Sequence, residues 1–423
     1  MVGTILFFGL IIFVLLGMPI GFALCVIGLI LFFVSGSPME MMPIVLFDGA
    51  NNFPLLAIPL FMLVGELMGA CKLSGRLINF AASLVGFLRG GLAHVTVLTS
   101  MLFAEISGSA VAGAAALGGI LIPQMKQKGY TPGFAVAIVS VASTMAIILP
   151  PSIPMILYGV MSGTSVTKLF IAGIIPGIIV GVALMITNYF FARKYNLGVQ
   201  QAFTIPNVGK TFKEAFWALT IPVIILGGIW GGIFTPTEAA GIAAVASFII
   251  GAFIYRELKW AEIPNLVLRA ANQTALTMII IAGSAIIGWF LTSEQIPQSI
   301  AAWAATLSTN KYAILAILNV FFLIVGMFLH SAAAIIMLIP ILMPLVHQLG
   351  IDPVHFGLII TINLGIGQQT PPVASVLLTA CSIGQTPLIK VLPYLKYYLL
   401  VMLLILALVT YIPSVSIWLP SIM

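Results

Sequence analysis

The sequence has few charged residues. Asp, Glu, Lys and Arg make up 6% of its 423 residues, whereas hydrophobic residues make up 61%. Since a soluble domain typically carries about 25% charged residues, this composition excludes a chain whose surface mostly faces water. The ten acidic residues leave few pairs for acid–base catalysis, and GxSxG, HExxH, P-loop and dinucleotide signatures are absent. We therefore expect no enzyme and no organic cofactor.

Cysteine is also scarce. Cys25, Cys71 and Cys381 lie in or beside apolar segments and show no CxxC spacing, which indicates buried apolar residues rather than a disulfide or metal site. The net charge is +6, but the cations are dispersed over short loops instead of forming a basic patch. We therefore expect no nucleic-acid partner.

What the chain does have is many long apolar runs. Leu169–Phe191, Phe216–Ile233 and Tyr397–Tyr411 are examples. With their flanks they are long enough to cross about 30 Å of hydrocarbon as helices. They lack the alternation of polar and apolar residues that an outer-membrane barrel requires. The predicted fold class is an all-α polytopic membrane protein, with membrane lipid as a partner.

The sequence also repeats itself weakly at an offset of 221 residues. Ile120-Leu121-x-Pro123 recurs as Ile341-Leu342-x-Pro344, and Pro150-Pro151 recurs as Pro371-Pro372. Proline and glycine set backbone shape, so the two halves share a pattern of breaks within hydrophobic segments. Paired broken segments are the best sequence indication of a binding site in a transporter.

The positive charges are distributed unequally between the two halves. Residues 50–165 contain five Lys or Arg, whereas the matching residues 271–386 contain one. Because cytoplasmic loops are enriched in Lys and Arg, this asymmetry predicts that the halves are inverted relative to each other. Placing the polar connector Arg193–Glu214 in the cytoplasm then puts 14 of the 16 basic residues on that side.

Two short polar interruptions predict hairpin tips. The first contains Ser107, Gly108 and Ser109 between two apolar runs, and the second contains His330 and Ser331. Non-helical backbone at membrane depth persists only where it is buried in protein or lines a cavity. The alternative for the first stretch is a helix-packing face of small residues. For His330, a proton relay and a structural polar residue facing a cavity are both open.

The two Pro-Pro pairs predict broken helices. Consecutive prolines remove two backbone donors and free carbonyl groups upstream. Freed carbonyls and Ser or Thr oxygens can coordinate Na⁺, while the N-termini of half-helices favour a carboxylate. A plain proline kink is the alternative, but the break occurs twice in register, which favours a site.

Several stretches resemble the large membrane subunit of TRAP (tripartite ATP-independent periplasmic) transporters. They are Phe103–Ala110, Pro150–Gly159, Gly232–Ala240 and Leu349–Gly357, followed by Asn363-Leu364 and Thr370-Pro371-Pro372. The resemblance covers essentially the whole chain. It implies an inverted-repeat elevator-type transporter with two re-entrant hairpins and two broken helices.

The resemblance also implies a function and partners. The function is Na⁺-coupled secondary active import of an organic acid, of the sialic acid or C4-dicarboxylate type, across the bacterial inner membrane. The implied partners are a small four-helix membrane subunit and a periplasmic substrate-binding protein. The alternatives are a stand-alone Na⁺/dicarboxylate carrier of related fold and a non-transporting membrane subunit of a larger complex.

The resemblance implies site residues as well. The first Na⁺ site would use Ser107, Ser109, Thr144 and carbonyls leading to Pro150, and the second Gly326, Gly365, Gly367 and Thr370. His330-Ser331 departs from relatives, which often carry an acidic residue there. No intramembrane Arg offers an obvious carboxylate clamp, so half-helix ends and hydroxyls are expected to hold the carboxylate. The expected substrate-binding residues are Ser107, Gly108, Ser152, His330, Ser331, Asn363 and Gln369.

These features together predict a division of the chain into scaffold and transport segments. Residues 1–91 form the first scaffold helices and arm, and 92–165 the first half of the transport domain. Residues 166–310 form connecting and scaffold helices with a cytoplasmic loop at 193–215. Residues 311–386 form the second half of the transport domain, and 387–423 a C-terminal scaffold helix.

Overall fold

The computed structural model describes residues 5–6, 8–9, 12–13, 16–71, 73–299, 302 and 310–422, without the side chains of 105–107. The predicted site residue Ser107 therefore has its side chain outside the described residues. The described part contains helices and no strand. Nine helical segments within it are long and apolar enough to cross a membrane, which confirms the all-α polytopic prediction.

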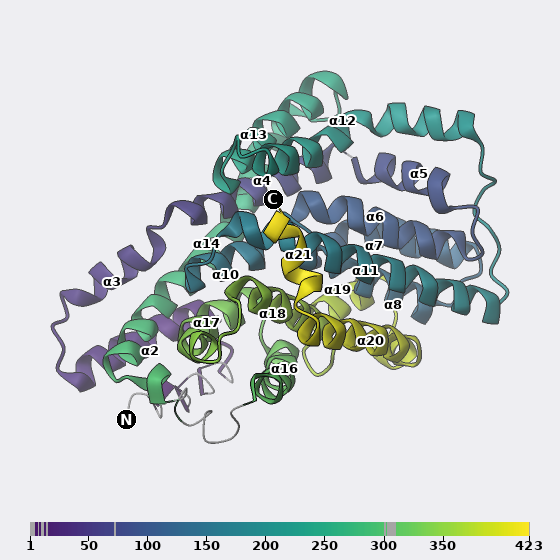
Figure 1. The fold of residues 1–423 in the computed structure, drawn as a ribbon. Coiled ribbons are helices and arrows are strands. Elements are labelled where there is room, and N and C mark those ends of the chain that lie inside the picture. The colour runs from purple at the N-terminus through teal and green to yellow at the C-terminus, as the bar shows by residue number, and fades with distance from the viewer. Residues whose placement is uncertain are drawn as a thin grey trace.

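Helices follow one another along the whole described chain (Figure 1). The first half contains α2 (Ile20–Ser35), α3 (Met41–Ala50), η1 (Phe53–Leu56), α4 (Ala57–Ala70), α5 (Leu73–Val85), α6 (Gly91–Ser107), α7 (Ala110–Gln127), α8 (Pro132–Ser143), α9 (Met145–Ile148), α10 (Ile153–Ser162) and α11 (Val166–Lys194). The second half contains α12 (Ile205–Trp230), α13 (Pro236–Ile249), η2 (Ile250–Ile254), η3 (Trp260–Glu262), α14 (Ile263–Ser293), α16 (Lys311–Phe328), α17 (Ser331–Gln348), α18 (Pro353–Gly367), α19 (Ser375–Ile383), α20 (Leu388–Tyr411) and α21 (Ser414–Ile422).

The repeat seen in the sequence is a repeat of structure. α7 and α17 occupy the same 18 positions at the 221-residue offset. The pairs α6 and α16, α8 and α18, α10 and α19, and α11 and α20 also correspond. Both Pro-Pro peptide bonds, at Pro150-Pro151 and Pro371-Pro372, are cis. The shared prolines and glycines therefore mark shared helix boundaries.

The two halves are inverted, and the long helix α11 shows it. Phe134, near the start of α8, has its ring centroid 5.3 Å from that of Phe191, near the end of α11. Gly357, near the start of α18, instead packs against Leu169, near the start of α11. A helix rises about 1.5 Å per residue, so these two contacts are separated by about 33 Å. α8 and α18 thus begin at opposite ends of the molecule.

The inverted halves interlock through matching contacts. α10 of the first half packs against α17 of the second, and α19 of the second half packs against α7 of the first. In the same way α13 packs against α4, while α14 packs against α2. The hairpins and broken helices of both halves therefore share one core.

One part of the repeat differs between the halves. The first half has three short elements, α3, η1 and α4, where the second half has the continuous helix α14. Asn52 has extended backbone immediately before η1, and Pro54 lies in the first turn of η1. The position equivalent to Pro54 is Ala275, which lets the helix continue. This single uninterrupted helix supplies a long wall beside the hairpins.

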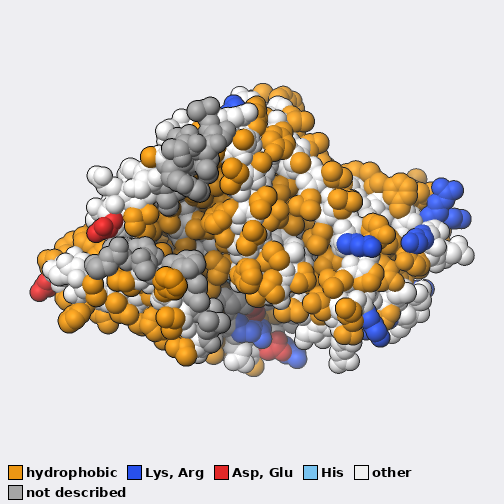
Figure 2. Space-filling model, turned by 90° about the horizontal axis from the view of Figure 1, so that it is seen from below, with side chains coloured by type: hydrophobic (Ala, Val, Ile, Leu, Met, Phe, Trp, Pro, Cys, Tyr) orange, Lys and Arg blue, Asp and Glu red, His pale blue; other side chains and the backbone are white. Residues whose placement is uncertain are grey.

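Basic side chains gather towards one end of the molecule. Figure 2 shows several Lys and Arg side chains at the right end of a largely apolar face, with a smaller charged group at its lower edge. Ring contacts between Tyr195 and Tyr394 bring the end of α11 to the start of α20, where Lys194 and Lys396 lie. This end also holds the start of α8, since Thr131 Oγ1 donates to Tyr394 Oη at 3.0 Å. Its cytoplasmic location stays a prediction.

Candidate transport site

Both predicted hairpins are present. In the first, α6 ends at Gly108, whose φ of +56° lies in the left-handed region that glycine favours. The side chain of Ser109 then accepts a hydrogen bond from the Ala112 amide at 3.4 Å and opens α7. In the second, His330 Nδ1 accepts from the Ala332 amide at 3.4 Å and opens α17. The two tips are therefore built alike, each capped by its own side chain.

Both Pro-Pro pairs interrupt their helices fully. After α9 the chain passes through Leu149 in extended conformation and restarts as α10 at Ile153. Ser152 Oγ donates to the Ile147 carbonyl at 2.6 Å, which satisfies one of the acceptors freed by the prolines. At the second break, Thr370 Oγ1 donates to the Ile366 carbonyl at 3.0 Å. These are discontinuous helices rather than kinks.

Each hairpin tip packs against the broken helix of its own half. A methyl group on Gly108 would lie 3.2 Å from the Pro151 carbonyl oxygen. In the second half the Val373 amide donates to the Met327 carbonyl at 3.2 Å. Gly326 and Gly367 approach so closely that a methyl group on Gly367 would lie 2.5 Å from the Gly326 Cα. Only glycine permits this approach.

The predicted Na⁺ residues lie at these junctions. Gly326, Gly367 and Thr370 are gathered where the second tip meets its break, and a methyl group on Gly365 would lie 3.9 Å from Thr144 Cβ. The Thr144 hydroxyl donates to the Val141 carbonyl at 2.6 Å, which leaves its oxygen lone pairs as acceptors. Hydroxyl and carbonyl oxygens of this kind suit Na⁺.

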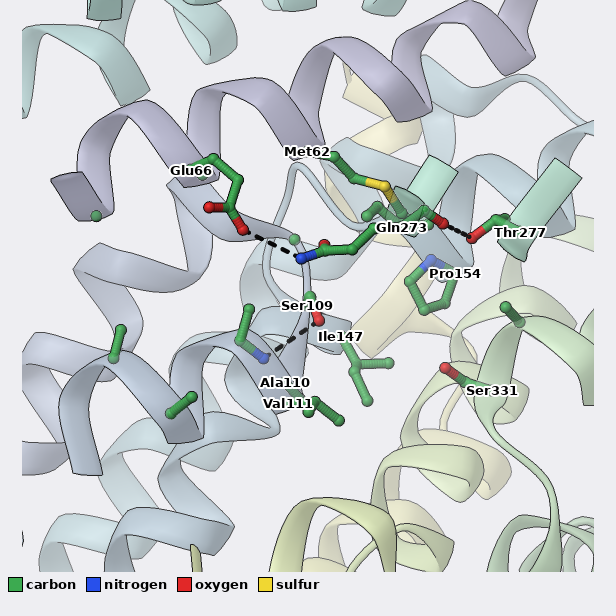
Figure 3. A pocket seen from close by; sticks show the side chains of 18 of the residues that line it. Met62, Glu66, Ser109, Ala110, Val111, Ile147, Pro154, Gln273, Thr277 and Ser331 are labelled. Atoms are coloured by element: carbon green, nitrogen blue, oxygen red, sulfur yellow. Dashed lines mark hydrogen bonds between the residues drawn. The ribbon is translucent and has the colours of Figure 1, made fainter. Parts of the chain in front are cut away.

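A cavity of about 680 Å³ lies between the two tips, the breaks and the helices α4 and α14. Figure 3 shows Met62, Glu66 and Gln273 on one side and Ser109, Val111 and Ser331 on the other. Ile147 beside the first break and Gln368 beside the second also line the cavity. The lining comprises Met62, Gly65, Glu66, Gly69, Ala70, Phe103, Gly108, Ser109, Ala110, Val111, Ala112, Ala115, Ala116, Ile147, Ile153, Pro154, Arg269, Gln273, Thr277, His330, Ser331, Ala332 and Gln368.

Three helices begin at the cavity wall. α7 starts at Ala110, α10 at Ile153 and α17 at Ser331, and all three residues line the cavity. The first amides of a helix lack intrahelical acceptors and carry a partial positive charge. Three such ends converging on one space favour an anion there.

Two buried polar side chains in the wall have no partner in the described chain. Ser331 and Gln368 are each 1% exposed, and neither the Ser331 hydroxyl nor either atom of the Gln368 amide has a hydrogen-bond partner there. An unmade hydrogen bond of this kind costs about 1–3 kcal/mol. A polar ligand in the cavity would satisfy these groups.

The structure separates the predicted substrate residues into two groups. Gly108, His330 and Ser331 line the cavity. Ser152 instead bonds the Ile147 carbonyl, and Asn363 Nδ2 donates to Asn319 Oδ1 on α16 at 2.6 Å. The Gln369 amide accepts from the Ser140 hydroxyl and donates to the Ser140 carbonyl at 2.9 Å. These last three side chains hold the core together.

One expectation about charge changes with the structure. Arg269 lines the cavity from the second turn of α14, so the expectation that no Arg serves the site needs correction. Arg269 Nε donates to Glu66 Oε2 at 2.8 Å, and Gln273 Nε2 donates to Glu66 Oε1 at 3.1 Å.

The profile of the family described as "Tripartite ATP-independent periplasmic transporter, DctM component" matches residues 7–415. The chain belongs to this family. It is 41% identical over 387 residues to the C4-dicarboxylate TRAP transporter large permease protein of Pseudomonas aeruginosa, covering 92% of this chain and 91% of that one. It is 36% identical to the sialic acid TRAP transporter large permease protein of Vibrio cholerae, covering 100% and 98%.

A third relative is longer. The isethionate TRAP transporter permease protein DctMQ of Oleidesulfovibrio alaskensis is 41% identical over 408 residues, which is 95% of this chain but 64% of that relative. Among solved structures, the Alcanivorax borkumensis YdaH transporter has a TM-score of 0.64 at 17% identity, with 88% of each chain covered. That likeness concerns the fold alone.

These findings confirm the resemblance of the sequence to TRAP large permeases. The chain is a transporter subunit rather than an enzyme, and a multi-pass membrane protein of a family typically found in the bacterial inner membrane.

Neighbouring glutamines allow a direct test of the cavity. We predict that Gln368→Met leaves thermal stability in detergent unchanged or raised, because it removes an amide without partners, but lowers uptake of cargo. The matched variant Gln369→Met should lower the free energy of unfolding by about 1–3 kcal/mol, because it leaves the buried hydroxyl and carbonyl of Ser140 without their partner. Thermal unfolding and uptake into proteoliposomes measure the two effects. Unchanged uptake by Gln368→Met would remove this side chain from the site.

Proposed function

We propose that this chain carries an organic acid inward across the bacterial inner membrane, coupled to Na⁺, as the large subunit of a tripartite transporter. The observation that supports it most is the cavity between the hairpin tips, where three helix N-termini meet the unpartnered Ser331 and Gln368. Helix N-termini supply positive potential and the two side chains supply hydrogen bonds. An organic anion with further oxygen atoms satisfies both.

The relatives support the same cargo chemistry. The three named above are described as transporters of isethionate, C4-dicarboxylate and sialic acid. Each of these molecules bears a carboxylate or a sulfonate on a small organic body. The cavity of about 680 Å³ accommodates any of them, so its volume does not select among them. We assign the cargo to the class of organic acids.

Na⁺ coupling is proposed from the two junctions of tip and break. Each junction combines a Pro-Pro break, whose prolines donate no backbone hydrogen bond, with a threonine hydroxyl, Thr144 in the first half and Thr370 in the second. The junctions lie next to the cavity, since Ile147 and Gln368 belong to the same breaks and line it. An ion bound there would stabilise the tip geometry that forms the cargo site.

An elevator is the proposed movement. The cavity has one wall from the hairpins and breaks and another from α4 and α14. The hairpin helices pack with the broken helices of both halves, as α7 does with α8 and α19, whereas α4 packs most extensively with α13 and α14 with α2. These contact preferences support two bodies, a transport domain and a scaffold, with the cargo between them.

The first test is uptake by purified components. We predict that proteoliposomes containing this chain, its small membrane subunit and its periplasmic binding protein accumulate a radiolabelled organic acid when Na⁺ is supplied outside. Succinate, N-acetylneuraminate and isethionate are suitable probes. Omission of either partner should abolish accumulation. Uptake at full rate by this chain alone would instead support a stand-alone carrier, and lack of uptake of every organic acid would refute the proposal.

The second test addresses the ion sites. We predict that Thr370→Ala raises the Na⁺ concentration needed for half-maximal uptake by about tenfold or more, because a contact to a charged group contributes about 1.5–3 kcal/mol. Thr379→Ala is the matched control, since its hydroxyl makes the same type of bond, to the Ser375 carbonyl at 2.8 Å, within α19. An equal Na⁺ dependence in both variants would argue against a site at Thr370.

A further inference from the structure

One ion pair stands apart from the rest of the cavity wall. Arg269 of α14 and Glu66 of α4 both line the cavity, and Arg269 is the only Lys or Arg among its described lining residues. Arg269 lies within the apolar span Trp260–Ser293. Ionisable side chains in such spans are costly and generally serve a pathway or a partner.

Glu66 uses more of its hydrogen-bonding capacity than Arg269 does. Glu66 accepts from Arg269 Nε at 2.8 Å through one oxygen and from Gln273 Nε2 at 3.1 Å through the other (Figure 3 shows the second bond). Arg269 uses only Nε, and the described residues place no acceptor on its two terminal nitrogens. Its side chain is 59% exposed, against 20% for Glu66. The guanidinium therefore keeps most of its five donors available.

The fold gains little from this pair. An ion pair with an exposed partner typically stabilises a protein by about 0–1 kcal/mol. What the pair does achieve is orientation, because Glu66 and Gln273 fix the Nε edge of the guanidinium in the wall. The free edge with its terminal nitrogens is the geometry that binds a carboxylate or another oxyanion through two parallel hydrogen bonds.

We propose that Arg269, positioned by Glu66 and Gln273, is a cargo-binding residue that recognises the acidic group of the cargo. This inference rests on the proposed function and deepens it, because it assigns a charged contact to the wall opposite the hairpin tips. The acidic group lies against Arg269, and the remainder of the cargo reaches Ser331 and Gln368 across the cavity.

The position of Arg269 has a consequence for the transport cycle. Arg269 and Glu66 belong to α14 and α4, the proposed scaffold, and not to the hairpins that would move with the cargo. The cargo therefore meets Arg269 only when the tips face these two helices. The residue sets affinity in this one state and leaves affinity in the opposite state unchanged.

Chemical labelling of arginine tests the contact without knowledge of the cargo. Phenylglyoxal modifies accessible guanidinium groups, and mass spectrometry reports each arginine separately. We predict that succinate, N-acetylneuraminate or isethionate protects Arg269 in the purified chain, whereas chloride at equal ionic strength does not. Arg76 is the internal control, since it is paired with Glu257 at 2.7 Å and does not line the cavity. Lack of protection by all three probes would overturn the inference.

Uptake by a charge-swapped variant separates binding from structure. Arg269→Gln should lower uptake about tenfold or more, and Arg269→Lys should restore only part of it, because Lys cannot bond bidentately. The double variant Glu66→Arg with Arg269→Glu keeps an ion pair between α4 and α14 but should not restore uptake. Full recovery in the swap would show that the pair is only structural and would overturn the inference.

The same experiments distinguish the inference from the proposed function. Wild-type uptake with unaffected Arg269→Gln uptake would refute the role of Arg269 and leave organic-acid transport standing. Anion protection of Arg269 in a wild-type system that transports no organic acid would refute the function and retain the binding site. Arg76→Gln is the control variant, and we expect uptake close to wild type.

Discussion

Backbone groups freed at the two Pro-Pro breaks must find partners in a core without water, and the architecture around the cavity depends on this constraint. A side chain within the first break satisfies part of it, as Ser152 does for the Ile147 carbonyl. The second hairpin tip satisfies another part, because its Met327 carbonyl accepts from the Val373 amide just beyond the break at 3.2 Å. Carbonyls at these junctions that lose their helical donor are the ligands that the proposed Na⁺ sites would use.

The inverted repeat brings the two breaks and the two hairpin tips together around one cavity. Each half supplies one tip and one break, and the exchange of contacts between α10 and α17 and between α19 and α7 brings both sets together. Residues of both halves line the cavity. The N-termini of three helices, two from the first half and one from the second, border this space, and their positive potential favours an anion there.

Much of this arrangement could be predicted from the sequence. Proline and glycine determine backbone geometry locally, so Pro150-Pro151 predicted the first break and Gly108 predicted the first hairpin tip. The unequal number of Lys and Arg residues in the two halves predicted their inversion, which the contacts of α11 with Phe134 and Gly357 confirm. The resemblance to TRAP permeases identified the family.

The orientation of individual side chains could not be predicted. Gln368 and Gln369 are neighbours in sequence, yet one faces the cavity and the other bonds Ser140, because adjacent residues point about 100° apart around a helical turn. Asn363 likewise faces Asn319. The pairing of Arg269 with Glu66 is a contact across 203 positions that no local pattern reports.

The central claim is that cargo binds between the hairpin tips and the wall formed by α4 and α14. The most direct measurement is a structure of this chain with its small membrane subunit in the presence of Na⁺ and a transported organic acid. The account predicts cargo density in contact with Ser331 and Gln368. Cargo density elsewhere, with this cavity holding only solvent, would contradict it.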